Sequence, residues 1–168
     1  MRSALLLYLL PALLAAAPSA GLREVLHPRS DLPAFRSLLP DGWTSEVDAA
    51  GNLLLANRDR SANFSLGFVH SPDPEGSLDA LAKAILASAV VKPWDNREPA
   101  EISGHRGYRY TARVRHTNGV EVRTEVVLVA VGTDHIAACS LLLGARVSRA
   151  DETTARLMHA AVRLLPAR

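Results

Sequence analysis

The order of apolar and polar residues divides the chain into short segments of two kinds. Three segments in the first half, WTSEVDA, NLLLAN and NFSLGFVH, mix apolar with polar residues and are separated by Gly51 and by the polar run at residues 58–61. Short segments divided by such turn residues predict antiparallel strands with tight connections. Two later runs, at residues 126–131 and 136–143, are apolar at consecutive positions. This pattern is typical of strands that are covered on both faces of their sheet.

Apolar residues recur at helical spacing in two places. Between Ser77 and Pro93 they predict a helix over residues 78–91, with Ser77 as its N-cap. A second predicted helix begins after Ser148, where Asp151 three residues later forms a weak capping box. Its expected inward stripe consists of Ala150, Thr154, Leu157, Ala161 and Leu164.

The predicted elements have a simple order along the chain. Residues 21–37 contain Pro28 and Pro33 and predict a lead-in, with one short helix near residues 32–39. Three strands, a helix, about four strands and a C-terminal helix follow. Short links imply antiparallel pairing, and doubly covered strands imply layers on both sides of the sheet. The sequence therefore predicts one α+β domain over residues 38–168, an antiparallel β-sheet flanked by helices in a layered sandwich.

The stretch YRYTARVRHTNGVEVRTE, residues 108–125, predicts an arginine-rich β-hairpin. A two-residue turn at Asn118-Gly119 would mix apolar and charged side chains on both faces. A three-residue loop over residues 117–119, with Gly119 in the left-handed conformation, keeps the two faces separate. One face then pairs His116 with Val120, Val114 with Val122, Ala112 with Thr124 and Tyr110 with Val126, and the other pairs Arg115 with Glu121, Arg113 with Arg123 and Thr111 with Glu125.

The charged face of this hairpin has two interpretations. Arg113 opposite Arg123 is unfavourable unless a glutamate of the same face or an external anion balances the two guanidinium groups. We favour a solvated sheet face; the alternative is an anion or acidic-partner site formed by Arg113, Arg115 and Arg123. A nucleic-acid platform is less favoured, because this register turns both tyrosines toward the core, where they cannot stack on bases.

The first twenty residues have the layout of a secretory signal peptide. Arg2 supplies a positive start, residues 5–17 form an apolar run, and small residues follow. We expect cleavage near Ser19 or Ala20. The run is shorter than the roughly 20 apolar residues that span a membrane, and no cysteine lies at the junction. We therefore expect a periplasmic or secreted chain without a stable membrane anchor.

Composition adds limits on the chemistry. The chain has 168 residues, 48% hydrophobic and 21% charged, which suits one globular domain. Its formal net charge of +2 does not indicate a nucleic-acid partner. Cys139 is the single cysteine, so no intramolecular disulfide is possible, and its apolar surroundings predict a buried, inert thiol.

No local motif for a metal or for catalysis is present. The six histidines form no HExxH or His-x-His motif, and the chain has no GxSxG. We expect neither a metal nor a cofactor. Trp94, in the loop after the first long helix, is expected to cap the core, with a partner-binding contact as the alternative.

Several of these features resemble a known fold family. Residues 39–43 (LPDGW), the Ile102-Ser103-Gly104 turn before the long hairpin, and the final amphipathic helix are similar to the PsbP-like fold, in particular to its bacterial DcrB-like exported branch. The resemblance spans about residues 38–165. It implies an antiparallel sheet flanked by helices that serves as an accessory or adaptor module. Many exported members are lipoproteins, and this sequence departs from them in lacking a cysteine at the signal junction.

These observations predict an exported soluble accessory or adaptor protein of the bacterial envelope that binds another envelope protein and is not an enzyme. The alternative is a small-ligand or anion-binding protein that uses the arginine face. An exported hydrolase with dispersed catalytic residues is the least favoured class.

Overall fold

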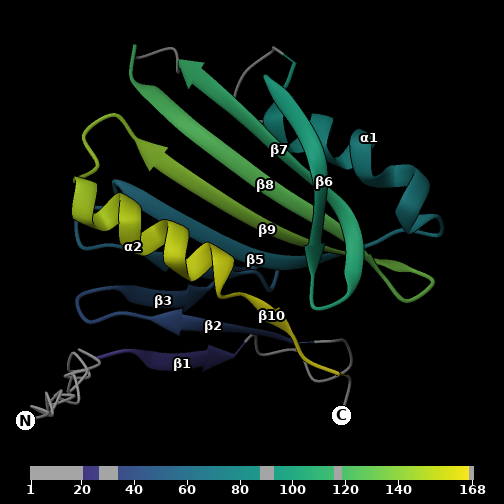
Figure 1. The fold of residues 1–168 in the computed structure, drawn as a ribbon, viewed down its shortest axis with the longest axis horizontal. Coiled ribbons are helices and arrows are strands. Elements are labelled where there is room, and N and C mark those ends of the chain that lie inside the picture. Colours follow the sequence, from purple (N-terminus) through teal and green to yellow (C-terminus); the bar gives the residue numbers. More distant parts are fainter. Residues whose placement is uncertain (1–20, 27–33, 88–92, 116–118, 167–168) are drawn as a thin grey trace, which may run out of the picture.

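The computed structural model describes residues 21–26, 34–87, 93–115 and 119–166, and these residues form two antiparallel sheets and two helices (Figure 1). The predicted signal segment, residues 1–20, lies outside this part of the chain. The large sheet has the spatial order β3 (Thr44–Val47), β4 (Leu53–Ala56), β5 (Ala62–His70), β9 (His135–Gly144), β8 (Glu121–Val131), β7 (His105–Arg115) and β6 (Asn96–Ile102). The small sheet has the order β1 (Arg23–Leu26), β2 (Phe35–Leu39) and β10 (Arg163–Leu164). The helices are α1 (Pro74–Ala87) and α2 (Arg149–Ala160).

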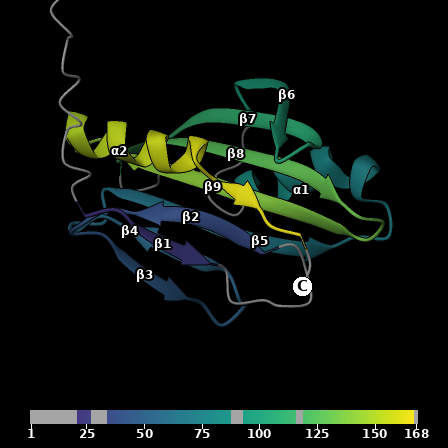
Figure 2. The same cartoon turned by 60° about the horizontal axis from the view of Figure 1, so that its bottom comes forward.

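The α+β class and the element order are confirmed. Strands β3, β4 and β5 precede α1, the strands β6 to β9 follow it, and α2 comes after them. All strand pairs of the large sheet are antiparallel. Helix α1 contacts β7, β8 and β9, whereas α2 contacts β5, β9 and the small-sheet strand β2. The two helices lie on opposite faces of the large sheet (Figures 1 and 2).

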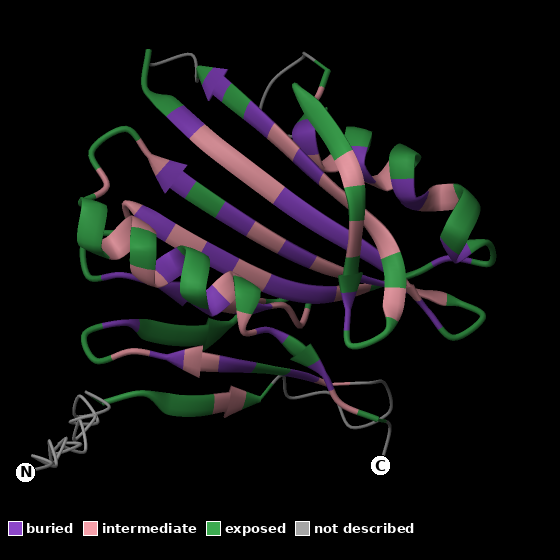
Figure 3. Cartoon of the chain, in the orientation of Figure 1, coloured by how far each residue is buried: buried purple, intermediate pink, exposed green. Residues whose placement is uncertain are grey.

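Each face of the large sheet has its own apolar core. Leu78 and Ala82 of α1 pack with Val126 and Leu128 of β8. The alternate residues of β8, including Val127, face the other way and pack in the cluster that contains Ala155 and Met158 of α2. This explains why the central strands are apolar at consecutive positions. Buried residues concentrate along these central strands, while β3 and β6 at the sheet edges are largely exposed (Figure 3).

The predicted short helix near residues 32–39 is wrong, because residues 35–39 form strand β2. Phe35, Ser37 and Leu39 are buried, whereas Arg36 is exposed, so burial alternates with the period of a strand. Backbone pairing with β1 on one side and β10 on the other completes the strand. The segment that the sequence predicted as a lead-in thus contributes to two strands, β1 and β2, and supplies the fully buried Phe35.

Two further details of the helices differ from expectation. Helix α1 begins at Pro74, and the Asp73 carboxylate accepts the Gly76 N–H at 3.0 Å, so Asp73 is its cap and Ser77 lies inside the helix. Helix α2 begins as predicted, because the Ser148 hydroxyl accepts the Asp151 N–H at 3.0 Å. Its predicted inward stripe is wrong: Leu157 is 65% exposed, and the helix instead buries Ala155 and Met158.

Gly107 allows β7 and β8 to approach closely, and this yields a testable prediction. A Cβ at Gly107 would overlap the Leu128 carbonyl oxygen and lie 2.8 Å from the Val129 Cα. Since both are backbone atoms of a central strand, no side-chain rotation relieves the overlap. We expect Gly107→Ala to lower the free energy of unfolding by about 1 to 3 kcal/mol, the usual range for overpacking, as measured by urea denaturation. Gly144→Ala is the control, because the nearest atom to its Cβ, the Ser61 carbonyl oxygen, would be 3.3 Å away, a contact that a shift of a few tenths of an ångström relieves. Its loss should be smaller, and an equal loss would contradict the explanation.

Candidate functional site

The hairpin register predicted from the sequence is confirmed over the described residues. Val114 pairs with Val122, Arg113 with Arg123 and Arg115 with Glu121. Tyr110, Ala112 and Val114 are buried on the face covered by α1, as expected. The predicted pairing of His116 with Val120 lies outside the described residues. The arginines therefore project from the opposite face, the one that α2 partly covers.

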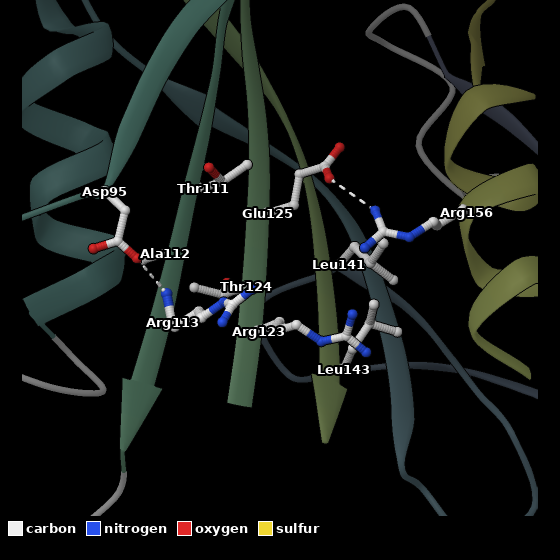
Figure 4. Close-up of a pocket in the computed structure, with 10 residues that line it drawn as sticks. All are labelled: Asp95, Thr111, Ala112, Arg113, Arg123, Thr124, Glu125, Leu141, Leu143 and Arg156. Atoms are coloured by element: carbon white, nitrogen blue, oxygen red, sulfur yellow. Dashed lines mark hydrogen bonds and ion pairs between the residues drawn. The ribbon is translucent and has the colours of Figure 1, made fainter. Parts of the chain in front are cut away.

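A groove of about 250 Å³ lies on this face, between the arginine-rich ends of β7 and β8 and helix α2 (Figure 4). Leu141 and Leu143 of β9 contribute its apolar lining. Its polar lining comes from Asp95, Thr111, Arg113, Arg123, Thr124, Glu125 and Arg156. Three guanidinium groups and two carboxylates thus surround two leucines. Two of the three sequence-predicted arginines, Arg113 and Arg123, line this groove.

Arg123 has a carboxylate partner that sequence reasoning missed. Its two terminal nitrogens donate to the two carboxylate oxygens of Glu152 on α2, at 2.7 and 2.6 Å. This bidentate pair holds the pKa of Arg123 above and the pKa of Glu152 below their ordinary values. Arg156, one turn after Glu152, contacts the same carboxylate at 3.0 Å. The charge of Arg123, which faces Arg113 across the hairpin, is therefore balanced from α2.

Glu125 is the centre of a second, more deeply buried charge cluster. Its side chain is 15% exposed and lies 3.1 Å from His159 Nδ1 and 3.5 Å from Arg156 on α2. Arg109 Nε of β7 lies 3.0 Å away, although its N–H is not aimed at the oxygen. The hydrogen bond from His159, with the nearby positive charges, holds the pKa of Glu125 below its ordinary value against the effect of burial. The cluster fastens α2 to the sheet beside the groove.

Arg113 and Arg115 have a different setting from Arg123. Both side chains are exposed. The backbone N–H of Arg113 donates to the Asp95 carboxylate at 2.6 Å, which ties the loop before β6 to the rim of the groove. Both side chains are therefore accessible to a molecule in solution.

Trp94 lies on the other face of the sheet and does not belong to the groove. Its indole N–H donates to the Ala82 carbonyl of α1 at 3.0 Å, and its ring centroid is 5.8 Å from that of Tyr110. It also packs against Leu86 and Val114. The indole therefore caps the core beneath α1, which was the preferred interpretation.

A charged cluster also covers the tyrosines of β7. The Tyr110 hydroxyl donates to the Asp79 carboxylate at 2.6 Å, and Arg97 donates to Asp79 at 2.8 Å. The Arg97 guanidinium lies 3.3 Å from the centroid of the Tyr108 ring. Burial, together with the Asp79 charge, raises the pKa of Tyr110 to about 12. Neither tyrosine offers an open ring face beside the arginines of the groove.

The strand register also brings two histidines together that no local motif relates. His70 of β5 and His135 of β9 are direct cross-strand partners, and Asp134 lies beside both. The signal in the sequence was the Asp134-His135 pair at a turn, but its partner depends on how β5 pairs with β9. Among the described residues, neither His135 nor His159 has a serine or cysteine side chain as a hydrogen-bond partner.

Comparisons with known proteins concern the fold. No protein-family model and no curated protein matches the sequence. A crystal structure from Bacteroides thetaiotaomicron VPI-5482 matches with a TM-score of 0.51 and 14% identity over 79% of this chain, which spans only 45% of that protein. None of the described helices is long and apolar enough to cross a membrane.

Two other solved structures match over nearly their whole length. LpqN of Mycobacterium tuberculosis, involved in cell envelope biogenesis, matches with a TM-score of 0.55 and 12% identity, covering 86% of this chain and 92% of LpqN. Cyanobacterial PsbP (CyanoP) of Synechocystis sp. PCC 6803 matches with a TM-score of 0.62 and 12% identity, covering 86% of this chain and 93% of CyanoP. The chain therefore has a PsbP-like fold.

Proposed function

We propose that this chain is an exported, non-catalytic accessory protein of the cell envelope that binds an acidic segment of another protein in the groove beside α2. The observation that carries the proposal is the lining of the groove, in which three guanidinium groups and two carboxylates surround Leu141 and Leu143. A segment with a carboxylate next to an apolar side chain complements such a lining. The involvement of LpqN, which has the same fold, in cell envelope biogenesis supports the cellular setting. Export by the predicted signal segment, residues 1–20, is part of the proposal.

The groove is smaller than the usual pocket for a drug-sized ligand, and its size suits side chains of a protein segment. Pockets for drug-sized ligands usually have volumes of about 300 to 1,000 Å³. The groove has about 250 Å³. It has room for one or two side chains of a bound segment. The exposed Arg115, which is outside the lining, extends the positive surface beyond the exposed Arg113. Exposed guanidinium groups raise the rate of association with an acidic partner and make it sensitive to salt.

The test is site-specific crosslinking in the organism that makes the protein. A photoreactive amino acid at Thr111, which lines the groove, should form an adduct with a partner in the envelope. Arg113→Glu combined with Arg115→Glu should reduce this adduct by at least about tenfold, because reversed charges repel an acidic segment. A matched double variant, Arg58→Glu with Arg106→Glu, makes the same charge change at exposed residues outside the groove. It should leave the adduct unchanged.

Two results would contradict the proposal. An adduct of equal yield in both double variants would show that the arginines of the groove do not select the partner. The second result is that no protein adduct forms, while inorganic phosphate or a dicarboxylate stabilises the purified chain and the Arg113 and Arg115 double variant loses this stabilisation. That result would favour a small-anion function. Thermal unfolding of each variant confirms that the fold is intact.

A further inference from the structure

Three side chains with metal-binding atoms meet at one end of the large sheet, away from the arginine-rich end of the hairpin. His70 is the last residue of β5, His135 is the first residue of β9, and the two are direct partners in the β5–β9 pairing. Asp134 immediately precedes His135. One ligand atom from each of the three residues can be chosen so that all three lie within 4.8 Å of one another. The group is separate from the groove.

The carboxylate lies beside both imidazoles. One carboxylate oxygen of Asp134 is 2.7 Å from Nδ1 of His135, and the other carboxylate oxygen is 4.0 Å from Nδ1 of His70. The two imidazole ring centroids are 5.4 Å apart. Ligand atoms that Zn²⁺ holds in a tetrahedron at about 2.0 to 2.2 Å stand roughly 3.4 Å from one another. The Asp134 oxygen and His135 Nδ1 therefore need to separate slightly, while the His70 ring needs to move closer. The His70 side chain is 69% exposed and has room to make this rotation.

The backbone that carries these ligands is held in place. The Ser71 N–H, next to His70, donates to the Asp134 carbonyl oxygen at 2.8 Å, which fastens the β8–β9 turn to the end of β5. Gly132 takes a positive φ of 62° in that turn. The His135 side chain is only 16% exposed and is therefore confined by its neighbours. The His135 side chain and the backbone of Asp134 are thus held before any ion arrives, which favours binding.

We propose that His70, Asp134 and His135 form a binding site for a divalent transition-metal ion of the Zn²⁺ class. Imidazole nitrogens suit Zn²⁺, Cu²⁺ and Ni²⁺, whereas Mg²⁺ and Ca²⁺ prefer oxygen ligands. Asp134 supplies a negative charge and an oxygen ligand. Because His70 and Asp134 are 69% and 53% exposed, water has access to the remaining coordination positions. The site joins the end of β5 to the β8–β9 turn.

Zn²⁺ binding to the mature chain, purified without a polyhistidine tag, tests this proposal. Isothermal titration should show Zn²⁺ binding that a large excess of Mg²⁺ does not displace. His70→Ala should lower the number of ions bound by one or weaken this binding by at least about tenfold, a loss seen even for residues that only support a metal ligand. Asp134→Asn should weaken it as well. Co²⁺ in place of Zn²⁺ should give a visible absorption band that His70→Ala removes.

His105→Ala is the matched control. Continuing the β7–β8 register by two residues from the pair of Gly107 with Val129 places His105 opposite Val131, and Val131 pairs with His135. His105→Ala should leave Zn²⁺ binding unchanged. The proposal is overturned if the mature chain binds no Zn²⁺, or if His70→Ala binds Zn²⁺ with the same number of ions and the same affinity. Since His70 is on the surface, its variant keeps the test valid even if a His135 variant fails to fold.

Discussion

Replacing Phe35 with alanine should lower the free energy of unfolding by about 3 to 5 kcal/mol, the range for deleting a buried aromatic ring. Phe35 is 0% exposed, and its ring centroid lies 4.7 Å from that of Phe68 on β5. It belongs to the cluster that also contains Met158 of α2. The side chain thus joins the small sheet, the large sheet and α2, and none of these can close the cavity alone. Urea denaturation followed by circular dichroism measures the loss.

Leu26→Ala is the control for this prediction. Leu26 lies in the same small sheet, on β1, but is 43% exposed. Its truncation removes little buried area and should change the free energy of unfolding by less than about 1 kcal/mol. A loss of similar size for both variants would mean that truncation anywhere in the small sheet unfolds the protein. A loss below about 1 kcal/mol for Phe35→Ala would mean that β2 is not part of the cooperative fold.

Replacing Glu125 with glutamine should be the second large effect, a loss of about 2 to 4 kcal/mol at pH 7. Removing one member of a buried charge cluster leaves the others without compensation, which typically costs about 3 to 5 kcal/mol. The Glu125 side chain is 15% exposed and contacts Arg109, Arg156 and His159. Partial access of water to Arg156 reduces the cost. Glutamine has nearly the same shape, so a loss reports on charge more than on packing.

The pH dependence of this loss follows from the direction of the pKa shift. Hydrogen bonding to His159 and nearby positive charges hold the folded-state pKa of Glu125 below its ordinary value of 4.5. A group of this kind stabilises the fold above its unfolded pKa, and the contribution disappears as the pH falls through the folded pKa. The difference between the wild type and Glu125→Gln should therefore be full above about pH 4.5 and should shrink as the pH falls below it. Chemical denaturation at a series of pH values measures this.

Glu121→Gln is the control for the charge cluster. Glu121 lies on the same strand opposite Arg115 and is exposed. An exposed pair of this kind contributes about 0 to 1 kcal/mol, so the variant should show little loss and little change with pH. If Glu121→Gln and Glu125→Gln gave the same pH profile, the contacts of Glu125 with α2 would not be the cause.

The charge clusters divide the arginines of the hairpin into two groups. Arg109 contacts Glu125, which also binds α2, and Arg123 contacts Glu152 of α2 itself, so replacement of either arginine disturbs the fold. Arg113 and Arg115 are exposed on the sheet and can be changed with less structural cost. A triple variant that included Arg123 would therefore mix a loss of stability with a loss of binding. This is why the test of function uses the two exposed arginines alone. Their role in binding remains a prediction.

The comparisons with solved structures establish the fold of this chain and not the roles of its residues. CyanoP and LpqN align with 86% of this chain, which establishes the PsbP-like fold at 12% identity. Identity this low transfers no residue role. The resemblance to the DcrB-like exported branch remains a prediction. The proposed groove and metal site rest on side chains of this chain alone.

Short-range patterns in the sequence specified most of the helices and strands and the register of the hairpin. Alternation of apolar and charged residues on both sides of Gly119 specified the pairing of Val114 with Val122, because a shift by one residue would bury charges. Consecutive apolar residues at 126–131 specified a strand covered on both faces. Ser148 and Asp151 marked the start of α2 through a hydrogen bond between residues three apart. These signals depend on neighbouring residues, so they can be read without the fold.

The contacts between distant segments depend on the tertiary structure. Residues 35–39 form a strand because β1 and β10 pair with them on both sides. The sequence of these five residues does not indicate either partner. The salt bridge from Arg123 to Glu152 depends on the angle at which α2 crosses the sheet. His70 and His135 face each other because β5 pairs with β9 in one particular register. Such contacts are fixed by burial of the whole core, since the free energy that selects them is shared among many residues far apart in the chain.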